Sequence, residues 1–311
     1  MKHFARGLAA VALALTSAST VAAERVHMNR TVETLEAGDA VFGLFTSDFS
    51  ISNAMALSRS ELDYIFIDME HTPFDTETLR TFLLGLQNKR RMLEKGSAQM
   101  DVTPIVRIPM YGREQLQFMV KQVLDVGAFG VLFPFIANKE EAENAVTAMR
   151  YPPQHGDAQP EPRGVRGSSP GLAAWLWGVG DYMERADTWP LDPDGDLLAV
   201  LQIENAEGVE NIEEIAAVPG VGAIFVGPAD LARSYGVSGS SHPDMQAALG
   251  RVLAACKANN VPCGLTTSAS TVEDYITEGW DFVTIGYWND AGISPAPAEA
   301  LARGRAAADR D

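Results

Sequence analysis

Short apolar runs alternate with amphipathic stretches along most of the chain. The runs lack the apolar–polar alternation of half-exposed strands, which indicates strands that are buried on both faces. The predicted strands are Val41–Thr46, Tyr64–Asp68, Pro104–Ile108, Gly130–Phe135, Leu197–Glu204, Ala223–Gly227, Cys263–Thr267 and Asp281–Gly286.

The stretches between these runs have the spacing of amphipathic helices. The clearest are Asp75–Leu93, Arg113–Val126, Lys139–Arg150 and His242–Asn259, and the typical helix-ending glycines are Gly127, Gly220 and Gly279. Glu24 to Asp39 is expected to be an arm or a first helix. Repeated strand–helix units predict one α/β domain over residues 24–311, a parallel (β/α)8 TIM barrel. An open dinucleotide-binding sheet is disfavoured because no GxGxxG turn follows the first strand.

Two polar stretches interrupt this rhythm. Asn88–Thr103 contains the basic run Lys89–Arg91, and His155–Pro162 is rich in Pro, Gln and Asp. Both are predicted to be surface loops, and the basic run is predicted to be a solvated helix end.

The N-terminus has the pattern of a secretory signal peptide. Lys2 and Arg6 precede an apolar run from Leu8 to Leu15, and small residues end at Ala23. We expect residues 1–23 to be removed by cleavage after Ala23. An uncleaved anchor is the alternative, but the run is shorter than the ~20 residues that span a bilayer. The mature chain is therefore expected to be exported, periplasmic or secreted, without a membrane anchor.

The net charge of −17 argues against a nucleic-acid partner, because an acidic surface repels phosphate backbones. The only cysteines, Cys256 and Cys263, match no zinc-binding spacing. Export would permit a disulfide. However, Cys256 lies late in a predicted helix and Cys263 opens a strand, so we expect two structural thiols.

Ionisable residues follow several of the predicted strands where they end. In α/β barrels, the active site lies at these carboxyl ends. The residues are Asp68, Glu70 and His71 after the second strand, Arg107 in the third, Gln202 and Glu204 at the end of the fifth, and Asp230 after the sixth.

Glu204 and Asp230 end neighbouring strands, so a barrel brings them close together. Two carboxylates with water suit a hard divalent cation such as Mg²⁺ or Mn²⁺. A 2-oxo acid can chelate such a cation, which then stabilises the enolate formed when a carbon–carbon bond breaks. The alternative for either carboxylate is a helix cap or a salt bridge.

His71 is the histidine that follows a core strand, and its ordinary pKa suits proton transfer. The others are His3 in the leader, His27 near the mature N-terminus, His155 in an insertion and His242 at a helix start. Asp68 or Glu70 is expected to orient His71, with only one of the two facing the site. A structural role for His71 is the alternative.

The lysines argue against a Schiff-base mechanism, which needs a lysine aimed into the barrel. Lys2 is in the leader, and the remaining lysines fall on predicted helices or loops: Lys89, Lys95, Lys121, Lys139 and Lys257. A metal ion is therefore expected to act as the electron sink.

Several stretches occur together in a specific order between about Gly38 and Ala300. They are Phe66-Ile67-Asp68-Met69-Glu70-His71, Pro104-Ile105-Val106-Arg107, Leu124-Asp125-Val126-Gly127-Ala128, Arg150-Tyr151-Pro152-Pro153, Arg163-Gly164, Gln202-Ile203-Glu204 and Val226-Gly227-Pro228-Ala229-Asp230-Leu231. This combination resembles the HpcH/HpaI aldolase family, the 2,4-dihydroxyhept-2-ene-1,7-dioate aldolase group of the phosphoenolpyruvate/pyruvate barrel superfamily.

The resemblance implies a reversible retro-aldol reaction that converts a 4-hydroxy-2-oxo acid into pyruvate and an aldehyde. It implies these roles: Glu204 and Asp230 as ligands of Mg²⁺, Mn²⁺ or Co²⁺, Gln202 beside the 2-oxo acid, Arg107 on the carbonyl and enolate oxygens, His71 with Asp68 in proton transfer, and the backbone of Ala229 and Asp230 on the pyruvate carboxylate. It also implies a homo-oligomer, a hexamer or trimer, in which a last helix such as Pro295–Arg310 packs on a neighbouring subunit.

The chain departs from the resemblance in its export leader, in the two insertions and in the segment Val165–Gly171. Trp175 and Trp177 follow that segment and are expected to serve packing rather than substrate binding. Two other functions stay open. One is a citramalate- or malyl-thioester-type lyase on the same barrel, and the other is a non-catalytic exported protein that binds oxo acids or metal.

Overall fold

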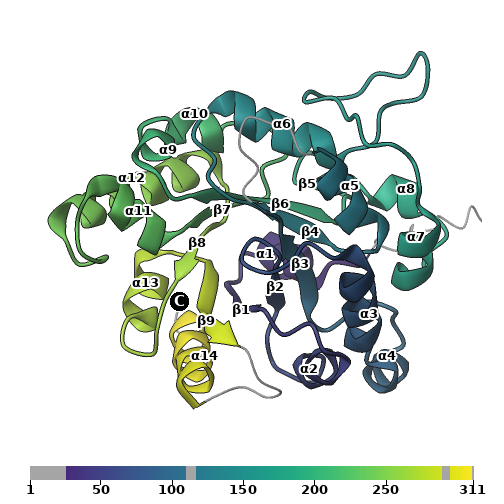
Figure 1. Cartoon of the computed structure of the whole chain (residues 1–311), viewed down its shortest axis with the longest axis horizontal. Helices are drawn as coiled ribbons and strands as arrows, with labels where there is room; N and C mark the ends of the chain where they lie inside the picture. Colours follow the sequence, from purple (N-terminus) through teal and green to yellow (C-terminus); the bar gives the residue numbers. More distant parts are fainter. Residues whose placement is uncertain (1–25, 110–116, 289–294, 310–311) are drawn as a thin grey trace, which may run out of the picture.

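A parallel β-barrel surrounded by helices forms the body of the protein (Figure 1). The computed structural model describes residues 26–109, 117–288 and 295–309. The strands run β1 (Val41–Thr46), β2 (Tyr64–Asp68), β3 (Thr103–Arg107), β4 (Gly130–Phe133), β5 (Thr188–Trp189), β6 (Leu197–Ile203), β7 (Ala223–Val226), β8 (Cys263–Thr266) and β9 (Phe282–Trp288).

Every strand pairing is parallel, and the order is β4-β3-β2-β1-β9-β8-β7-β6-β5. A further pairing between β4 and β6 closes the ring, while the two-residue β5 pairs with β6 beside it. The eight remaining strands are the eight predicted apolar runs, with ends that differ by up to two residues. The predicted single-domain α/β barrel is therefore confirmed.

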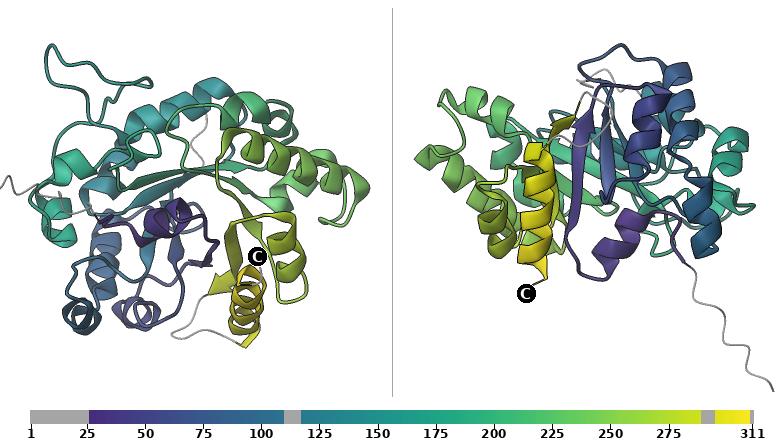
Figure 2. Two further views of the ribbon diagram at one scale, coloured as in Figure 1. Left: turned by 180° about the vertical axis from the view of Figure 1, so that it is seen from behind. Right: turned by 90° about the horizontal axis from the view of Figure 1, so that it is seen from below.

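Helices cover the outside of the barrel (Figures 1 and 2). Their bounds are α1 (Arg30–Glu36), α2 (Ile51–Leu57), α3 (Thr76–Leu86), α4 (Lys89–Lys95), α5 (Gln117–Asp125), α6 (Lys139–Met149), α7 (Gly171–Trp177), α8 (Tyr182–Arg185), α9 (Ala206–Glu210), α10 (Ile212–Ala216), α11 (Pro228–Tyr235), α12 (Pro243–Asn259), α13 (Val272–Glu278) and α14 (Pro295–Ala308). The three glycines predicted to end helices all have positive φ, the conformation that glycine adopts without steric cost.

Alternate residues of each strand point to opposite sides of the barrel wall, and this divides the core in two. One cluster fills the barrel interior and includes Phe45, Phe66 and Phe225. The other packs between the strands and the helices and includes Ile65, Ile67 and Met69. The same alternation decides which residues at the strand ends face the barrel mouth.

The prediction of a loop over Asn88–Thr103 was wrong for its first half, because α4 forms there. Asn88 caps this helix by accepting a hydrogen bond from the backbone of Arg91, and Gly96 ends it in the left-handed conformation. None of the residues in α4 is buried, so the helix lacks the apolar stripe that a sequence pattern would reveal. The predicted helix Asp75–Leu93 is accordingly two helices, and Lys89–Arg91 forms the exposed first turn of α4.

The second polar stretch, His155–Pro162, lacks regular secondary structure, as predicted. The chain around it projects from the barrel (Figures 1 and 2). Arg150 is buried at its base, where it donates hydrogen bonds to the carbonyl oxygens of Pro160 at 2.9 Å and Pro162 at 2.5 Å. A buried guanidinium therefore fixes both ends of this excursion.

The expectation of two free thiols was wrong, because Cys256 and Cys263 form a disulfide. Asn260 turns the chain back after α12 with a positive φ, which brings the helix end beside the start of β8. The Cα atoms of the two cysteines lie 5.9 Å apart, within the usual range for a disulfide. Spacing along the chain did not reveal this turn.

Removing the disulfide is expected to destabilise the fold by about 2 kcal/mol, because it closes a short loop of the unfolded chain. The measurement is chemical unfolding of the variant Cys256→Ser/Cys263→Ser beside the unaltered chain, each with and without reductant. Reductant should lower the stability of the unaltered chain alone. Equal stability of the variant and of the oxidised unaltered chain, its disulfide confirmed by mass, would contradict the prediction.

The signal peptide, residues 1–23, lies outside the described residues, as do residues 110–116 of the predicted helix that begins at Arg113. None of the described helices combines the length and apolarity needed to span a bilayer.

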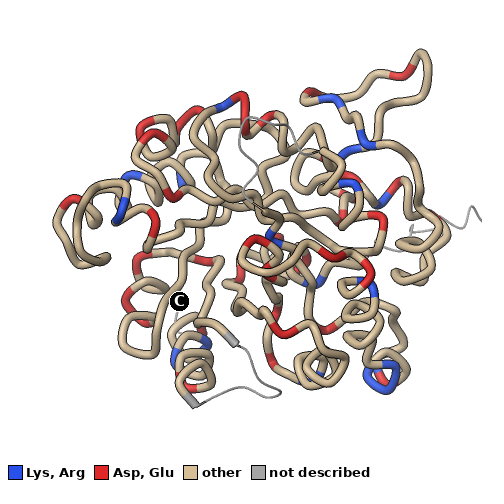
Figure 3. The backbone as a smooth tube through the Cα atoms, viewed as in Figure 1, with Lys and Arg blue, Asp and Glu red and all other residues tan. Residues whose placement is uncertain are grey.

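The last helix, α14, packs on α13 and β9 of its own barrel (Figure 2). Asp and Glu positions occur along many of the surface helices (Figure 3).

Candidate active site

Side chains from the carboxyl ends of the strands line a cavity of about 300 Å³ at the barrel mouth. The lining residues are Phe45, His71, Arg107, Gln202, Glu204, Phe225, Gly227, Pro228, Ala229, Asp230, Thr266 and Tyr287. Six predicted site residues are among them: His71, Arg107, Gln202, Glu204, Ala229 and Asp230. The seventh, Asp68, lies beside Arg107 and His71. The tertiary structure thus brings together residues that are far apart in the sequence.

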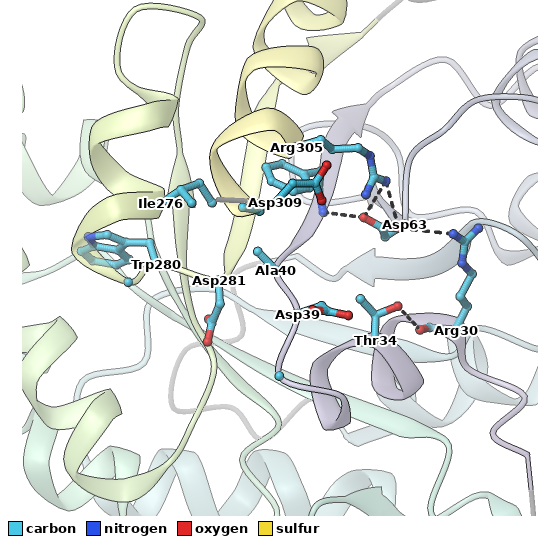
Figure 4. A pocket seen from close by; sticks show the side chains of 14 residues that line it. Arg30, Thr34, Asp39, Ala40, Asp63, Ile276, Trp280, Asp281, Arg305 and Asp309 are labelled. Carbon is cyan, nitrogen blue, oxygen red and sulfur yellow. Dashed lines mark hydrogen bonds and ion pairs between the residues drawn. The ribbon is translucent and has the colours of Figure 1, made fainter. Parts of the chain in front are cut away.

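A larger hollow of about 580 Å³ lies at the opposite end of the barrel (Figure 4). Its central group is the buried Asp63, which accepts a hydrogen bond from the backbone of Phe42 at 2.8 Å and pairs with Arg305 at 3.0 Å. Arg30 lies 3.8 Å from the same carboxylate. These charges satisfy one another, and this end of α/β barrels usually serves stability rather than catalysis. The smaller cavity is therefore the better candidate for an active site.

Arg107 organises one side of the site. Its guanidinium donates two hydrogen bonds to Asp68, at 2.9 and 2.5 Å, and lies 3.2 Å from Glu70. It also lies 2.8 Å from Nδ1 of His71. Both carboxylates therefore contact Arg107, and the expectation that only one would face the site was wrong. Residues 68 and 70 are two positions apart and share a face, while Met69 between them packs outward.

Burial and the contacts with Arg107 shift the pKa values of Asp68 and Glu70 in opposite directions. Burial alone would raise the pKa of Asp68, but hydrogen bonds and charge from Arg107 lower it below its ordinary value. Burial raises the pKa of Glu70 although Arg107 and His71 oppose the shift. Asp68 is therefore the carboxylate that Arg107 holds ionised. Of the other described histidines, His27 contacts Asp196 at 2.9 Å, His155 lies in the projecting polar stretch and His242 caps α12, whereas His71 lines the cavity.

Glu204 is buried on the other side of the cavity. Gln202 donates a hydrogen bond to it at 2.6 Å. Burial raises the pKa of Glu204 to about 8, and the carboxylates of Glu70 and Asp230 add to the shift. Within the described parts of the chain, no lysine or arginine forms an ion pair with Glu204 or Asp230. The amide oxygen of Gln202 is also buried without a hydrogen-bond partner.

These observations fit a divalent cation. Carboxylates that repel one another, next to an unsatisfied amide oxygen, form the oxygen-rich set that Mg²⁺ or Mn²⁺ prefers. Asp68, Glu70 and His71 also offer ligand atoms within 4.8 Å of one another. However, Arg107 already contacts all three of these residues, so its positive charge disfavours a second cation there. Glu204 and Asp230 are therefore the better candidates for metal ligands.

A glycine at the end of β7 lets these groups approach the chain. Gly227 lies beside Glu204 because β6 and β7 pair Ile203 with Val226. A Cβ atom at position 227 would collide with the carboxylate of Glu204 and would lie 2.8 Å from Nε2 of Gln202. Only glycine leaves both side chains where they are.

Gly227→Ala is expected to displace Glu204 and Gln202 and to reduce affinity for Mn²⁺ by roughly 10- to 100-fold, as displaced ligand supports do elsewhere. Isothermal titration with Mn²⁺ measures this effect. Gly250→Ala is the matched control, because a Cβ there meets nothing within 4 Å. Equal affinity in both variants would show that Glu204 and Gln202 do not contribute to the metal site.

Several lining residues were missed by the sequence analysis. Phe45 and Phe225 had been assigned only to strands, and Tyr287 lies one residue beyond the predicted end of its strand. Their position at strand ends was the available signal. The five described lysines all lie on helices, as expected.

The packing role expected of the two tryptophans is confirmed for Trp177 alone. Its ring stacks on Phe129 at 4.0 Å, and it donates a hydrogen bond to the carbonyl oxygen of Gly127 at 2.9 Å. Trp175 is 65% exposed on α7, so it does not pack within the core of its own chain. Neither residue lines the cavity.

Comparison with known proteins identifies the family of the chain. The family model described as HpcH/HpaI aldolase/citrate lyase matches residues 41–295. The 5-keto-4-deoxy-D-glucarate aldolases of Salmonella arizonae and Salmonella paratyphi A are each 33% identical over 280 residues, which cover 89% of this chain and 96% of theirs.

Solved structures share the fold along nearly the whole chain. An HpcH/HpaI aldolase/citrate lyase family protein from Burkholderia cenocepacia has a TM-score of 0.70 at 30% identity, covering 91% of this chain and 98% of its own. Macrophomate synthase has a TM-score of 0.64 at 23% identity, covering 96% and 99%. On the matches to the family model and to these relatives, the chain belongs to the HpcH/HpaI aldolase/citrate lyase family.

Proposed function

We propose that this protein is a divalent-metal-dependent aldehyde-lyase that reversibly cleaves a 4-hydroxy-2-oxo acid into pyruvate and an aldehyde. The observation that carries the proposal is the buried Glu204 carboxylate, which lies near Asp230, forms no ion pair with a described lysine or arginine, and lies across the cavity from Arg107 and His71. The names of the curated relatives support the same reaction class.

Glu204 and Asp230 would hold the cation, and Gln202 would contact the 2-oxo acid beside it. A bound divalent cation supplies Lewis-acid stabilisation of the negative charge that develops on the oxygen next to the breaking bond. The backbone N–H groups of Ala229 and Asp230, in the first turn of α11, are oriented to bind the carboxylate of the 2-oxo acid.

The other side of the cavity provides charge and proton transfer. The guanidinium of Arg107, fixed by Asp68, lies where it can donate hydrogen bonds to a carbonyl or enolate oxygen. Nδ1 of His71 lies 3.3 Å from Asp68 and can donate its hydrogen to that carboxylate, which leaves Nε2 to exchange a proton with the 4-hydroxyl group of the substrate. An imine mechanism is disfavoured because the described lysines lie on helices outside the barrel.

The direct test uses the purified mature chain, pyruvate and a panel of aldehydes with Mn²⁺, Mg²⁺ or Co²⁺, together with 5-keto-4-deoxy-D-glucarate in the cleavage direction. Chelator-sensitive aldol product supports the proposal. Turnover of a malyl or citramalyl thioester without aldol activity would support the thioester lyase instead. Pyruvate binding without turnover of any substrate would support a non-catalytic binding protein.

We also propose that the chain is exported and assembles as a homo-oligomer, a trimer or hexamer. The disulfide supports export, because such bonds persist in oxidising compartments. Large apolar side chains are exposed on the adjoining helices α3, α5 and α7, at Leu84, Phe118 and Trp175, which supports burial against a second copy. Cell fractionation with N-terminal sequencing tests export, and light scattering of Trp175→Arg beside the unaltered chain tests assembly.

A further inference from the structure

Tyr287 lines the cavity but has no role in the proposed catalytic mechanism. It lies near the end of β9, where pairing with β1 places it beside Phe45. The two rings stack with centroids 4.9 Å apart and planes 16° apart. Tyr287 is 55% exposed whereas Phe45 is 1% exposed, so the tyrosine covers the phenylalanine and extends to the mouth of the cavity.

The hydroxyl group of Tyr287 lies next to the guanidinium of Arg107. Arg107 packs over the ring of Phe45, with its central carbon 4.5 Å from the ring centroid. Burial raises the pKa of Tyr287, and the charge of Arg107 and a hydrogen bond from it partly oppose this shift. The phenol therefore keeps its proton at neutral pH and can donate a hydrogen bond into the cavity.

The two sides of the cavity differ in what they can recognise. Gln202, Glu204 and Asp230 form the side assigned to the cation and the 2-oxo acid. Phe45, Phe225 and Tyr287 form an aromatic side, on which the phenol carries the polar group. The aldehyde half of the substrate must then lie between His71 and this aromatic side.

We propose that Tyr287 is a specificity-determining residue that recognises a hydroxyl group on the carbon next to the aldehyde carbonyl. This inference rests on the proposed function and names the electrophile as a 2-hydroxyaldehyde. The phenol is the polar group on the aromatic side of the cavity, so a hydroxyl group on the aldehyde half of the substrate is the group that it can pair with.

The experiment compares the Mn²⁺-loaded unaltered chain with Tyr287→Phe, which keeps the stacked ring and removes only the hydroxyl group. Each protein condenses pyruvate with glycolaldehyde, with propanal, which has a methyl group in place of the hydroxyl, and with glyoxylate. Tyr287→Phe should reduce the ratio of kcat/KM for glycolaldehyde to kcat/KM for propanal by about five- to ten-fold, because a site built for a hydroxyl rejects the analogue that lacks it. The KM for pyruvate should not change.

Tyr275→Phe is the matched control, because Tyr275 on α13 packs against the ring of Trp280 and lies outside the cavity lining. An unchanged ratio in Tyr287→Phe, with an active unaltered chain, would overturn the inference and leave the proposed function standing. A preference for glyoxylate that depends on Tyr287 would overturn it as well. Absence of aldol product from the unaltered chain with every aldehyde would instead reject the proposed function.

Discussion

Glu204→Gln is expected to remove metal-dependent aldol activity, with a fall in kcat/KM of about three orders of magnitude. The amide has nearly the shape of the carboxylate but lacks the charge that holds a divalent cation. Loss of a Lewis acid costs several kcal/mol of transition-state stabilisation, and each 1.36 kcal/mol is a factor of ten in rate. Initial rates with pyruvate and an aldehyde measure the effect, together with Mn²⁺ titration.

The stability of the metal-free protein separates this loss from unfolding. Burial raises the pKa of Glu204 to about 8 in the fold, above the ordinary value for glutamate. The stability that this group contributes is therefore full below the unfolded pKa and is lost as pH rises through about 8. Glu204→Gln should thus be more stable than the unaltered chain at pH 9 in chelator, by on the order of 3 kcal/mol.

Glu207→Gln is the control for this prediction, because Glu207 is exposed on α9 three residues away. It should keep both activity and metal affinity. An inactive Glu204→Gln that is less stable at pH 9 would point to a structural role. An active variant with unchanged affinity for Mn²⁺ would remove Glu204 from the metal site.

Arg107→Met is expected to destabilise the protein by about 3 kcal/mol at pH 7 and to abolish activity. The change leaves Asp68 buried without the guanidinium that donates two hydrogen bonds to it. Breaking one side of a buried ion pair commonly costs 3–5 kcal/mol, because the remaining charge stays buried. Urea unfolding measures the loss of stability, and aldol rates measure the loss of activity.

The effect should depend on pH in a defined direction. Burial raises the pKa of Asp68, but Arg107 lowers it further, so the pKa in the fold lies below the ordinary aspartate value. The ion pair therefore stabilises the protein fully above the ordinary aspartate pKa, and this stabilisation is lost as the pH falls through the lowered pKa. The difference between Arg107→Met and the unaltered chain should therefore shrink below about pH 4.

A second substitution tests the cause. Asp68→Asn in the Arg107→Met background should restore part of the stability and none of the activity, because the unpaired charge is gone but the guanidinium is still absent. Arg251→Met is the matched control, since Arg251 pairs with Glu213 at the surface, where an ion pair contributes little to stability. Equal losses from both arginine variants would contradict the prediction.

The fold could be predicted because most of the strands are buried on both faces and so appear as uninterrupted apolar runs. Tyr64–Asp68 and Leu197–Ile203, for example, are buried throughout. Where burial was slight, the pattern failed. The helix α4 buries no residue, and its caps, Asn88 and Gly96, are its main sequence signal.

The candidate site could be predicted in its polar half. Parallel strands carry their last residues to the same end of a barrel, so His71, Arg107, Glu204 and Asp230 were expected together from their places after the strands. Tyr287 and Phe45 were missed because the sequence pattern assigns an aromatic residue at a strand end to the hydrophobic core. Its neighbour on the next strand, which the pattern does not reveal, decides whether it lines the cavity. Only one of Asp68 and Glu70 was expected to face the site, whereas the carboxylates of both residues pair with Arg107.

The sequence by itself determined the barrel, its strand ends and the chemical types of the groups at its mouth, because local apolar patterning and chain order are enough to specify them. Only the tertiary structure decided that Cys256 meets Cys263, that Arg107 lies between two carboxylates, and that Tyr287 covers Phe45. Each of these contacts depends on a turn or a strand register that sets distances between separate elements, and such distances are not encoded in the spacing of residues along one element.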